Sequence, residues 1–498
     1  LSAFYGSPMG SMAARTGWGD TVENPSVVAQ MKMDEYWFAN HQTPAAGNFA
    51  LYYKGPLTGQ SGVYDIYGSP AFNHYNHHSV ASNCLLVYDP NEPLANFDNK
   101  PNDGGQFRHN NTSAKSFEEL LTNPILKKNT IEGHEIDPKD LMTPDYSYFK
   151  GNLTNSYSDK ITDYTRSMMF LNLKDETVPA ALVVFDKVSV KDPSFKKTWV
   201  LHGQTYPKFE RNRTIWYSSP YVNDLGERYT GKMLNDALLP ADSKTTKTVI
   251  GSEEDGWNIN AGVNVLGNTQ NTKKAEENTY RLEIATTEPN ETEYFLNVLQ
   301  VTDEGNTVYH STTLHDSELF YGASISDRVV FFSKTGDRVS GTAKITVPAG
   351  NARKFMICDI EAGVWEVTTS EGTQKVTATE DGGVLSFTAN GGEITLTKTT
   401  EEPEVSEPEE LVLGTKKTLY VKANNQYVNQ PVECDIVDGR YLIAIDHLAV
   451  KMGLKATKEF MKNVYEDEKQ GIVTTVRHGS DIMYVNDKEV KLASPTYF

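Results

Sequence analysis

The sequence predicts a mainly β protein built around a large antiparallel β-sandwich, and two patterns of side chains support this fold class. Residues 49–53 and 280–284 alternate between two kinds of side chain with the period of two that a half-buried strand shows. Residues 180–185, 296–301 and 329–332 form short, continuous apolar runs. Runs of this length are typical of central sandwich strands rather than of helices.

Turn-forming residues recur between these expected strands. Gly-Gly follows Glu-Asp at residues 380–383 and Ala-Asn at residues 389–392. Their spacing predicts hairpins, so we expect neighbouring strands to run antiparallel.

A change of composition at residues 399–410 divides the chain. This segment, TTEEPEVSEPEE, carries six Glu and two Pro, and Val405 is its one large apolar residue. Because like charges and proline keep such a segment extended, we expect an acidic linker. A large β region would precede it, and a small domain of residues 411–498 would follow.

The small domain is expected to be α+β. Residues 418–422 and 441–444 read as strands, and residues 471–486 as a hairpin. Asp446 suits the N-cap of a short helix and Gly453 its C-terminal cap. The apolar residues of that helix share one face: Ile445, Leu448, Ala449 and Met452.

Composition excludes several classes of function. A formal net charge of −19 argues against a nucleic-acid surface, which needs an excess of Lys and Arg. The sequence has no apolar stretch of about 18 residues, so we expect no membrane span. Cys84, Cys358 and Cys434 lie far apart in apolar runs without metal-binding spacing, and we expect them to be buried. Any export signal is expected upstream of Leu1 or already removed.

Aromatic, imidazole and basic side chains crowd the turns between residues 14 and 90. They are Trp18, Trp37, His41, Lys54, Tyr64, Tyr67, His74, Tyr75, His77 and His78. Rings of this kind stack on sugars, while His and Lys meet carboxylates or sulfates, so the pattern favours a sugar-binding cleft. The alternatives are structural: a hydrogen-bonded strand-end His41, solvated charges at Arg15 and Lys54, and a chance surface cluster of histidines. His202 could face either the cleft or the core.

The blocks at residues 14–20, 37–70 and 73–92 resemble the start of the C-terminal sheet domain of heparinase II/III-like polysaccharide lyases. These blocks begin ARTGWGD, WFANHQ and NHYNHH, and later segments such as 196–210 and 363–396 are similar to later strands of that family. The resemblance covers about 400 residues. It implies a lyase-like sandwich over residues 1–320, with residues 321–398 as the terminal sheet part of the same region.

The resemblance implies β-elimination on a uronic-acid polysaccharide. That reaction needs a neutralised carboxylate, a base for the neighbouring carbon and an acid for the departing oxygen. In the family most of these groups come from a helical toroid, and the sheet domain contributes one histidine, which His41 matches. The residues expected to contact substrate are Arg15, Lys54, Tyr64, Tyr67, His74, Tyr75 and His78. No toroid is visible in this sequence.

The family's zinc position is expected to be lost, so we predict no cofactor. Where the family carries His, Asp and His, this sequence has Thr43, Gln60 and Ser82. An uncharged set of this kind does not hold Zn²⁺. His74, His77 and His78 could form a different site.

The small last domain resembles the copper amine oxidase N-terminal-like stalk module of secreted Gram-positive proteins. His447 and His478 have no partners at ligand spacing, so the resemblance implies a spacer or wall-associated role without copper.

The sequence is compatible with three hypotheses about function. One is a secreted bacterial lyase-type protein acting on a uronate or cell-wall glycan, with its toroid encoded upstream or supplied by a partner chain, and inactive without it. The second is a non-catalytic cell-surface or filament scaffold that self-assembles. The third is a glycan-binding module that does not cleave.

Overall fold

The structure is a computed structural model of the whole chain. It describes residues 2–19, 21–22, 24–38, 42–62, 72–92, 102–107, 114–140, 143–251, 258–259, 263–264 and 280–401, together with the strands and adjoining residues of the last domain between 414 and 491. The chain divides into two compact units, residues 1–401 and 402–498. No described helix is long and apolar enough to cross a membrane.

The first unit opens with a five-stranded antiparallel sheet of β1 (Ala3–Tyr5), β2 (Ser11–Arg15), β3 (Val28–Lys32), β4 (Phe49–Tyr52) and β5 (Pro56–Thr58). Its side chains alternate as the sequence predicts: Phe49 and Leu51 are buried, whereas Tyr52 is exposed. The sheet therefore has one core face and one face open to solvent.

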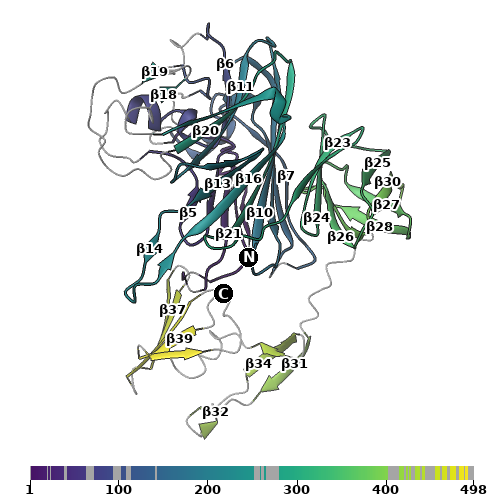
Figure 1. Cartoon of the computed structure of the whole chain (residues 1–498). Coiled ribbons are helices and arrows are strands. Elements are labelled where there is room, and N and C mark those ends of the chain that lie inside the picture. The colour runs from purple at the N-terminus through teal and green to yellow at the C-terminus, as the bar shows by residue number, and fades with distance from the viewer. Residues whose placement is uncertain are drawn as a thin grey trace. The chain divides into compact units, whose positions relative to one another are not determined.

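An eight-stranded antiparallel sheet forms the centre of the unit (Figure 1). Its order is β12 (Lys208–Glu210), β13 (Arg213–Tyr217), β16 (Gly231–Leu239), β21 (Thr292–Asp303), β10 (Ala180–Val190), β9 (Ile161–Asn172), β8 (Tyr146–Asn152) and β7 (Thr130–Ile136). A four-stranded sheet is formed by β17 (Thr245–Ile250), β20 (Tyr280–Thr286), β11 (Lys196–Gly203) and β6 (Leu85–Tyr88).

Two further sheets form a smaller sandwich. One has the order β22 (Thr312–Asp316), β23 (Phe320–Ile325), β24 (Arg328–Ser333), β26 (Arg353–Ile357) and β29 (Leu385–Ala389). The other has the order β25 (Thr342–Val347), β30 (Gly392–Lys398), β27 (Gly363–Thr369) and β28 (Gly372–Ala378). The pair β24–β26 is parallel, whereas the other strand pairs of these two sheets are antiparallel.

The cores stack these sheets in layers. One core lies between one face of the eight-stranded sheet and the five- and four-stranded sheets, and includes Phe49, Trp199 and Trp216. A second core lies between the opposite face and the sheet that contains β24, and includes Phe185 and Phe332. Because both of its faces are covered, the central sheet has the continuous apolar strands that the sequence shows.

The predicted mainly β sandwich is confirmed, and so is the burial of Cys84 and Cys358. Trp199, Trp216 and Trp365 are fully buried as well. Two expectations were wrong. The turns at residues 380–383 and 389–392 do not close hairpins: β28 and β30 belong to one sheet and β29 to the other, so each turn crosses between layers. The alternation expected at residues 280–284 is wrong at Arg281, which is fully buried against Tyr75.

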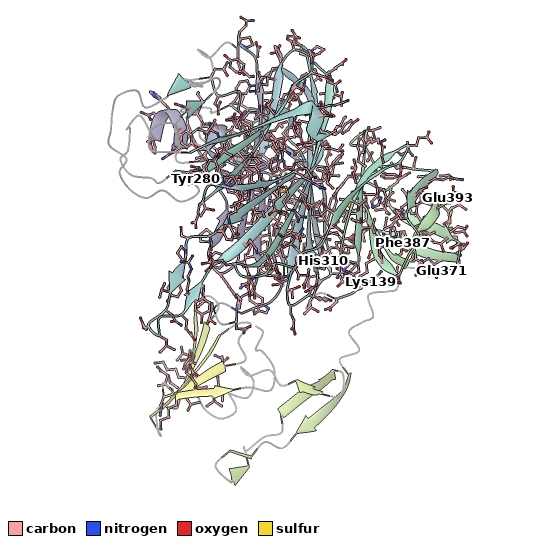
Figure 2. All side chains as sticks on the ribbon, in the orientation of Figure 1. Lys139, Tyr280, His310, Glu371, Phe387 and Glu393 are labelled. Carbon is pink, nitrogen blue, oxygen red and sulfur yellow. The ribbon has the colours of Figure 1, made fainter. Side chains whose placement is uncertain are left out.

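The large and small sandwiches of the first unit are joined by a buried ion pair. Lys150 Nζ lies 2.8 Å from Asp359 Oδ1, and both side chains are 4% exposed. Asp359 also accepts hydrogen bonds from the Tyr148 hydroxyl and the Ser333 amide. At the rim, Lys139 Nζ donates to the carbonyl of Ser386, beside Phe387 (Figure 2).

The second unit contains a three-stranded sheet, a two-stranded ribbon and a five-stranded antiparallel sheet. Their orders are β31 (Gly414–Leu419), β34 (Val432–Val437), β35 (Arg440–Leu442); β32 (Lys422–Ala423), β33 (Gln426–Tyr427); and β36 (Lys455–Glu459), β37 (Lys462–Asp467), β38 (Ile472–Arg477), β39 (Ile482–Val485), β40 (Lys488–Lys491). The predicted hairpin is formed by β38 and β39. The helix expected at Asp446–Gly453 lies outside the described residues.

Candidate functional site

The candidate residues fall at two places in the first unit. Arg15 ends β2, and Lys54 follows β4 at the same end of the five-stranded sheet, where Arg15 is in register with Val28 and Val28 with Tyr52. His74, Tyr75, His77 and His78 lie on and just after a π-helical turn (Phe72–Asn76). His41, Tyr64 and Tyr67 lie outside the described residues.

Lys54 is held by neighbouring side chains. Its backbone has φ of 52°, and its ammonium group lies 2.7 Å from Asp303 Oδ1 and 5.4 Å from the centre of the Tyr53 ring. The side chain is 17% exposed. Because Asp303 already neutralises this cation, a uronate would have to compete with that carboxylate.

Tyr75 is buried and bonded. Arg281 Nη1 donates to the Tyr75 hydroxyl at 3.2 Å, and Arg281 Nε donates to Glu283 Oε1 at 2.9 Å. Burial opposes the charge of Arg281, but Tyr75 and Glu283 raise its pKa above the ordinary value. The Tyr75 ring is 1% exposed, so it supports the interior of the unit rather than offering a stacking surface.

His78 is buried as well and ties two loops together. Its Nε2 lies 3.1 Å from the carbonyl of Asn73, and its Nδ1 lies 3.8 Å from Asp103 Oδ1. Asp103 accepts amide hydrogen bonds from Val80 and Gly105. Burial raises the pKa of Asp103, but the bonds from His78 and these amides outweigh it and leave the pKa lowered. Of the described histidines in this turn, His74 is the exposed one.

Asn83 is the centre of a buried hydrogen-bond network that the sequence did not single out. Its amide nitrogen donates to the Phe49 carbonyl and to Thr58 Oγ1, both at 2.8 Å. Its amide oxygen accepts from the backbone amide of His202 at 2.8 Å and lies 3.2 Å from His202 Nδ1. Burial, with Arg281 nearby, lowers the pKa of His202 well below its ordinary value. His202 is thus a neutral core residue.

The three positions that correspond to the family's metal ligands do not fit a metal. Thr43 lines a small pocket, Gln60 donates to the carbonyl of Asn76 at 3.3 Å, and Ser82 is fully buried. Two hydroxyls and a side-chain amide cannot replace the imidazole and carboxylate ligands of Zn²⁺. Among the residues that the structure describes, no group of three or more His, Cys, Asp or Glu could hold a metal ion.

The pocket beside Thr43 contains two titratable groups that the sequence analysis missed. It is lined by Asp34, Tyr36, Trp37, Gln42, Thr43, Pro44, Ala45, Ala46, Gln106, Phe107, Lys128 and Ser156. Burial raises the pKa of Asp34, although Lys32 lies 3.4 Å away, and burial lowers the pKa of Lys128 to about 8. Perturbed groups in a pocket are typical of functional sites. Nothing in the local pattern around Lys128 indicates its burial.

Residues 314–398 match a family model. That family is the heparinase II C-terminal domain. The matched segment comprises most of the smaller sandwich, from β22 to β30. The match does not include the residues that carry the candidate site or residues 411–498, so the stalk-like assignment of the last domain stays a prediction.

Solved structures of heparin-type lyases are similar to part of the chain. Heparan sulfate lyase HepC from Pedobacter heparinus is 16% identical, with 67% of this chain and 42% of that chain covered and a TM-score of 0.42. The Heparinase III-BT4657 gene product is 12% identical at the same coverage, with a TM-score of 0.43. The chain thus spans less than half the length of these lyases. No curated protein matched the sequence.

Proposed function

We propose that this chain binds an acidic, uronate-containing polysaccharide through the large sandwich of its first unit. The observation that carries the proposal is the match of residues 314–398 to the heparinase II C-terminal domain. The smaller sandwich formed by these residues shares a core with the central sheet, so the matched segment is one layer of a larger body. The motif blocks of the sequence that resemble heparinase II/III-like lyases lie in that same body.

The proposed ligand is anionic, so the binding surface has to differ from the rest of the molecule. A net charge of −19 repels a polyanion, and a local cation has to outweigh that repulsion. Arg15 supplies such a cation at the end of β2, 4.8 Å from the centre of the Trp18 ring. Lys54, which is paired with Asp303, supplies a second cation at the same end of the sheet.

In this proposal His41 contacts the sugar that would react, and the chain alone does not cleave the polysaccharide. The resemblance assigns the remaining acid–base groups to a helical toroid. Tyr75 and His78 do not substitute for them, because both are buried and held by Arg281 and Asp103. We place the protein outside the cell, at the cell surface, where such polymers occur.

A second candidate is a non-catalytic surface scaffold that has kept the lyase fold. Thr43, Gln60 and Ser82 favour it, because three metal-ligand positions of the family carry uncharged residues here. A fold can keep its core while its site is lost.

The proposal is tested by mixing the purified chain with heparan sulfate, hyaluronan, alginate and pectate. Two readings are taken: bound polymer by calorimetry, and ultraviolet absorbance from unsaturated uronides. We expect binding without absorbance, and we expect His41→Ala to weaken binding. His310→Ala is the matched control, because His310 pairs with Asp175 in connections between strands and is not among the expected substrate contacts. Absence of binding to all four polymers would favour the scaffold instead.

A further inference from the structure

The outward face of the five-stranded sheet carries an ordered arrangement of side chains. On β2, β3 and β4, residues Arg15, Val28 and Tyr52 are in register and form one row. The next row on the same face is Ala13, Gln30 and Ala50. Side chains on one face of a strand are two residues apart, so the long side chains of Arg15 and Tyr52 lie next to the short side chains of Ala13 and Ala50.

Aromatic rings on this face are open to solvent. Tyr52 is 47% exposed and Trp18, on the connection from β2 to β3, is 39% exposed. The Arg15 guanidinium lies 4.8 Å from the centre of the Trp18 ring. Arg15 and Tyr52 are separated by two strand spacings, which is about 10 Å. Arg15 therefore contacts the Trp18 ring and shares its row with Tyr52.

The connection that carries Trp18 is tightly built. The Thr16 amide donates to the Val27 carbonyl at 3.1 Å, and the Val27 amide donates to Thr16 Oγ1 at 2.9 Å. At Gly19, a Cβ atom would lie 2.0 Å from the carbonyl oxygen of Asn24, so the close approach requires glycine. These contacts hold described residues on both sides of Trp18, which lowers the conformational entropy that a ligand stacking on Trp18 would cost.

The charge of this face differs from that of the molecule. The ten outward positions of β1 to β4 are Ala3, Tyr5, Ser11, Ala13, Arg15, Val28, Gln30, Lys32, Ala50 and Tyr52. Two are cations and none is Asp or Glu, in a chain with 66 acidic residues. Lys32 has Asp34 at 3.4 Å beyond the end of its strand. The described strand positions of this face thus carry two cations and no carboxylate.

We infer that Trp18, Arg15 and Tyr52 form a stacking platform for two neighbouring sugar rings of an acidic polysaccharide, with the Arg15 guanidinium meeting the carboxylate or sulfate between them. Aromatic rings bind pyranose faces, Arg pairs with planar anions, and Gln30 in the adjoining row supplies a hydrogen-bonding group. This inference rests on the proposed function and deepens it. It identifies a binding surface that is distinct from the turn containing His74.

Calorimetric titration of the full chain with heparan sulfate and hyaluronan tests the platform. We expect Trp18→Ala and Tyr52→Ala each to weaken binding by up to about tenfold, the size of one aromatic contact. Arg15→Gln should weaken binding and flatten its dependence on salt. Tyr221→Ala is the matched control, since Tyr221 is 53% exposed on another element, and it should bind as the wild type does.

The outcomes separate the two proposals. If the wild type binds and the Trp18 and Tyr52 variants bind equally well, the platform is overturned and the proposed function stands. If Tyr221→Ala weakens binding as much as Tyr52→Ala, the platform is overturned too. If the wild type binds neither polymer, the proposed function fails and the platform fails with it. Because Trp18 and Tyr52 are exposed, near-ultraviolet circular dichroism is expected to confirm that both variants fold.

Discussion

Asn83 shows how a single polar side chain organises the interior of the large sandwich. Its amide satisfies the Phe49 carbonyl, Thr58 and the His202 amide, and all of these groups are buried. Each buried group that loses its partner costs about 1 to 3 kcal/mol. The network connects the five-stranded sheet to β11, so Asn83 stabilises the relative position of two sheets that share a core.

We therefore expect Asn83→Ala to lower the free energy of unfolding by about 3 kcal/mol, because several partners lose their bonds together. Denaturant titration measures this change. Asn351→Ala, at an exposed position, is the control and should change stability by less than about 0.5 kcal/mol. Equal effects at the two positions would contradict the role assigned to Asn83.

Lys128 gives a prediction for pH dependence. Burial lowers the pKa of its ammonium group from 10.5 to about 8, so between those values the unfolded chain binds more protons than the folded one. The free energy of unfolding should therefore gain a contribution from Lys128 that rises with pH across this window. Lys128→Met removes that contribution. The difference in stability between wild type and variant, measured from about pH 7 to pH 10.5, should shift in favour of the wild type as pH rises above about 8. A constant difference would contradict the lowered pKa.

At the scale of single residues, the sequence could indicate a crowded polar region but not its burial. The Tyr and His residues around residue 75 suggested a sugar cleft. Tyr75 and His78 are instead buried, where they interact with Arg281 and Asp103, which are distant in sequence. Asp34 and Lys128 meet in one pocket through the fold alone. An interaction between side chains that are distant in sequence leaves no pattern in the local sequence around either of them.

At the scale of elements, the ion pair between β8 and the residue after β26 joins two sandwiches. Lys150 and Asp359 are both almost fully buried, and Asp359 accepts two further hydrogen bonds. Removing one partner of a buried pair leaves an uncompensated charge, which costs about 3 to 5 kcal/mol. Breaking the pair is therefore expected to lower the stability of the joined sandwiches.

We expect Asp359→Asn to destabilise the chain by about 3 kcal/mol, because Lys150 then keeps the more exposed carboxylate of Glu132, 3.4 Å away, in place of the buried one. The double variant Lys150→Met with Asp359→Leu should lose less than the two single changes together. Lys344→Gln, in an exposed pair with Glu393, is the control and should lose less than about 1 kcal/mol. Thermal unfolding followed by circular dichroism measures all of these variants, and a fully additive double variant would argue against the buried pair.

The strands themselves were predictable, but their assignment to sheets was not. Local alternation and apolar runs reported β4, β10, β21 and β24 correctly. The turn at residues 389–392 looked like a hairpin, yet it passes from one sheet of the small sandwich to the other. A Gly-rich turn specifies how the chain reverses, whereas the packing of both faces decides which strands pair.

At the scale of the whole molecule, the first unit is a stack of sheets in which the eight-stranded sheet is covered on both faces. The sequence predicted the sandwich class because the central strands are apolar throughout. The resemblance divides one lyase-like region between residues 320 and 321, and this division stays a prediction; residue 320 lies in β23 of the smaller sandwich. The second core packs residues from both sides of that boundary together, a continuity that strand patterns alone do not report.

We propose that this body binds acidic polysaccharides on the open face of its five-stranded sheet. The direct test is calorimetric titration of the wild-type chain with heparan sulfate and with neutral dextran at low salt. The account predicts saturable binding of heparan sulfate that weakens as salt is added, and no binding of dextran. Equal binding of both polymers, or binding of neither, would contradict it.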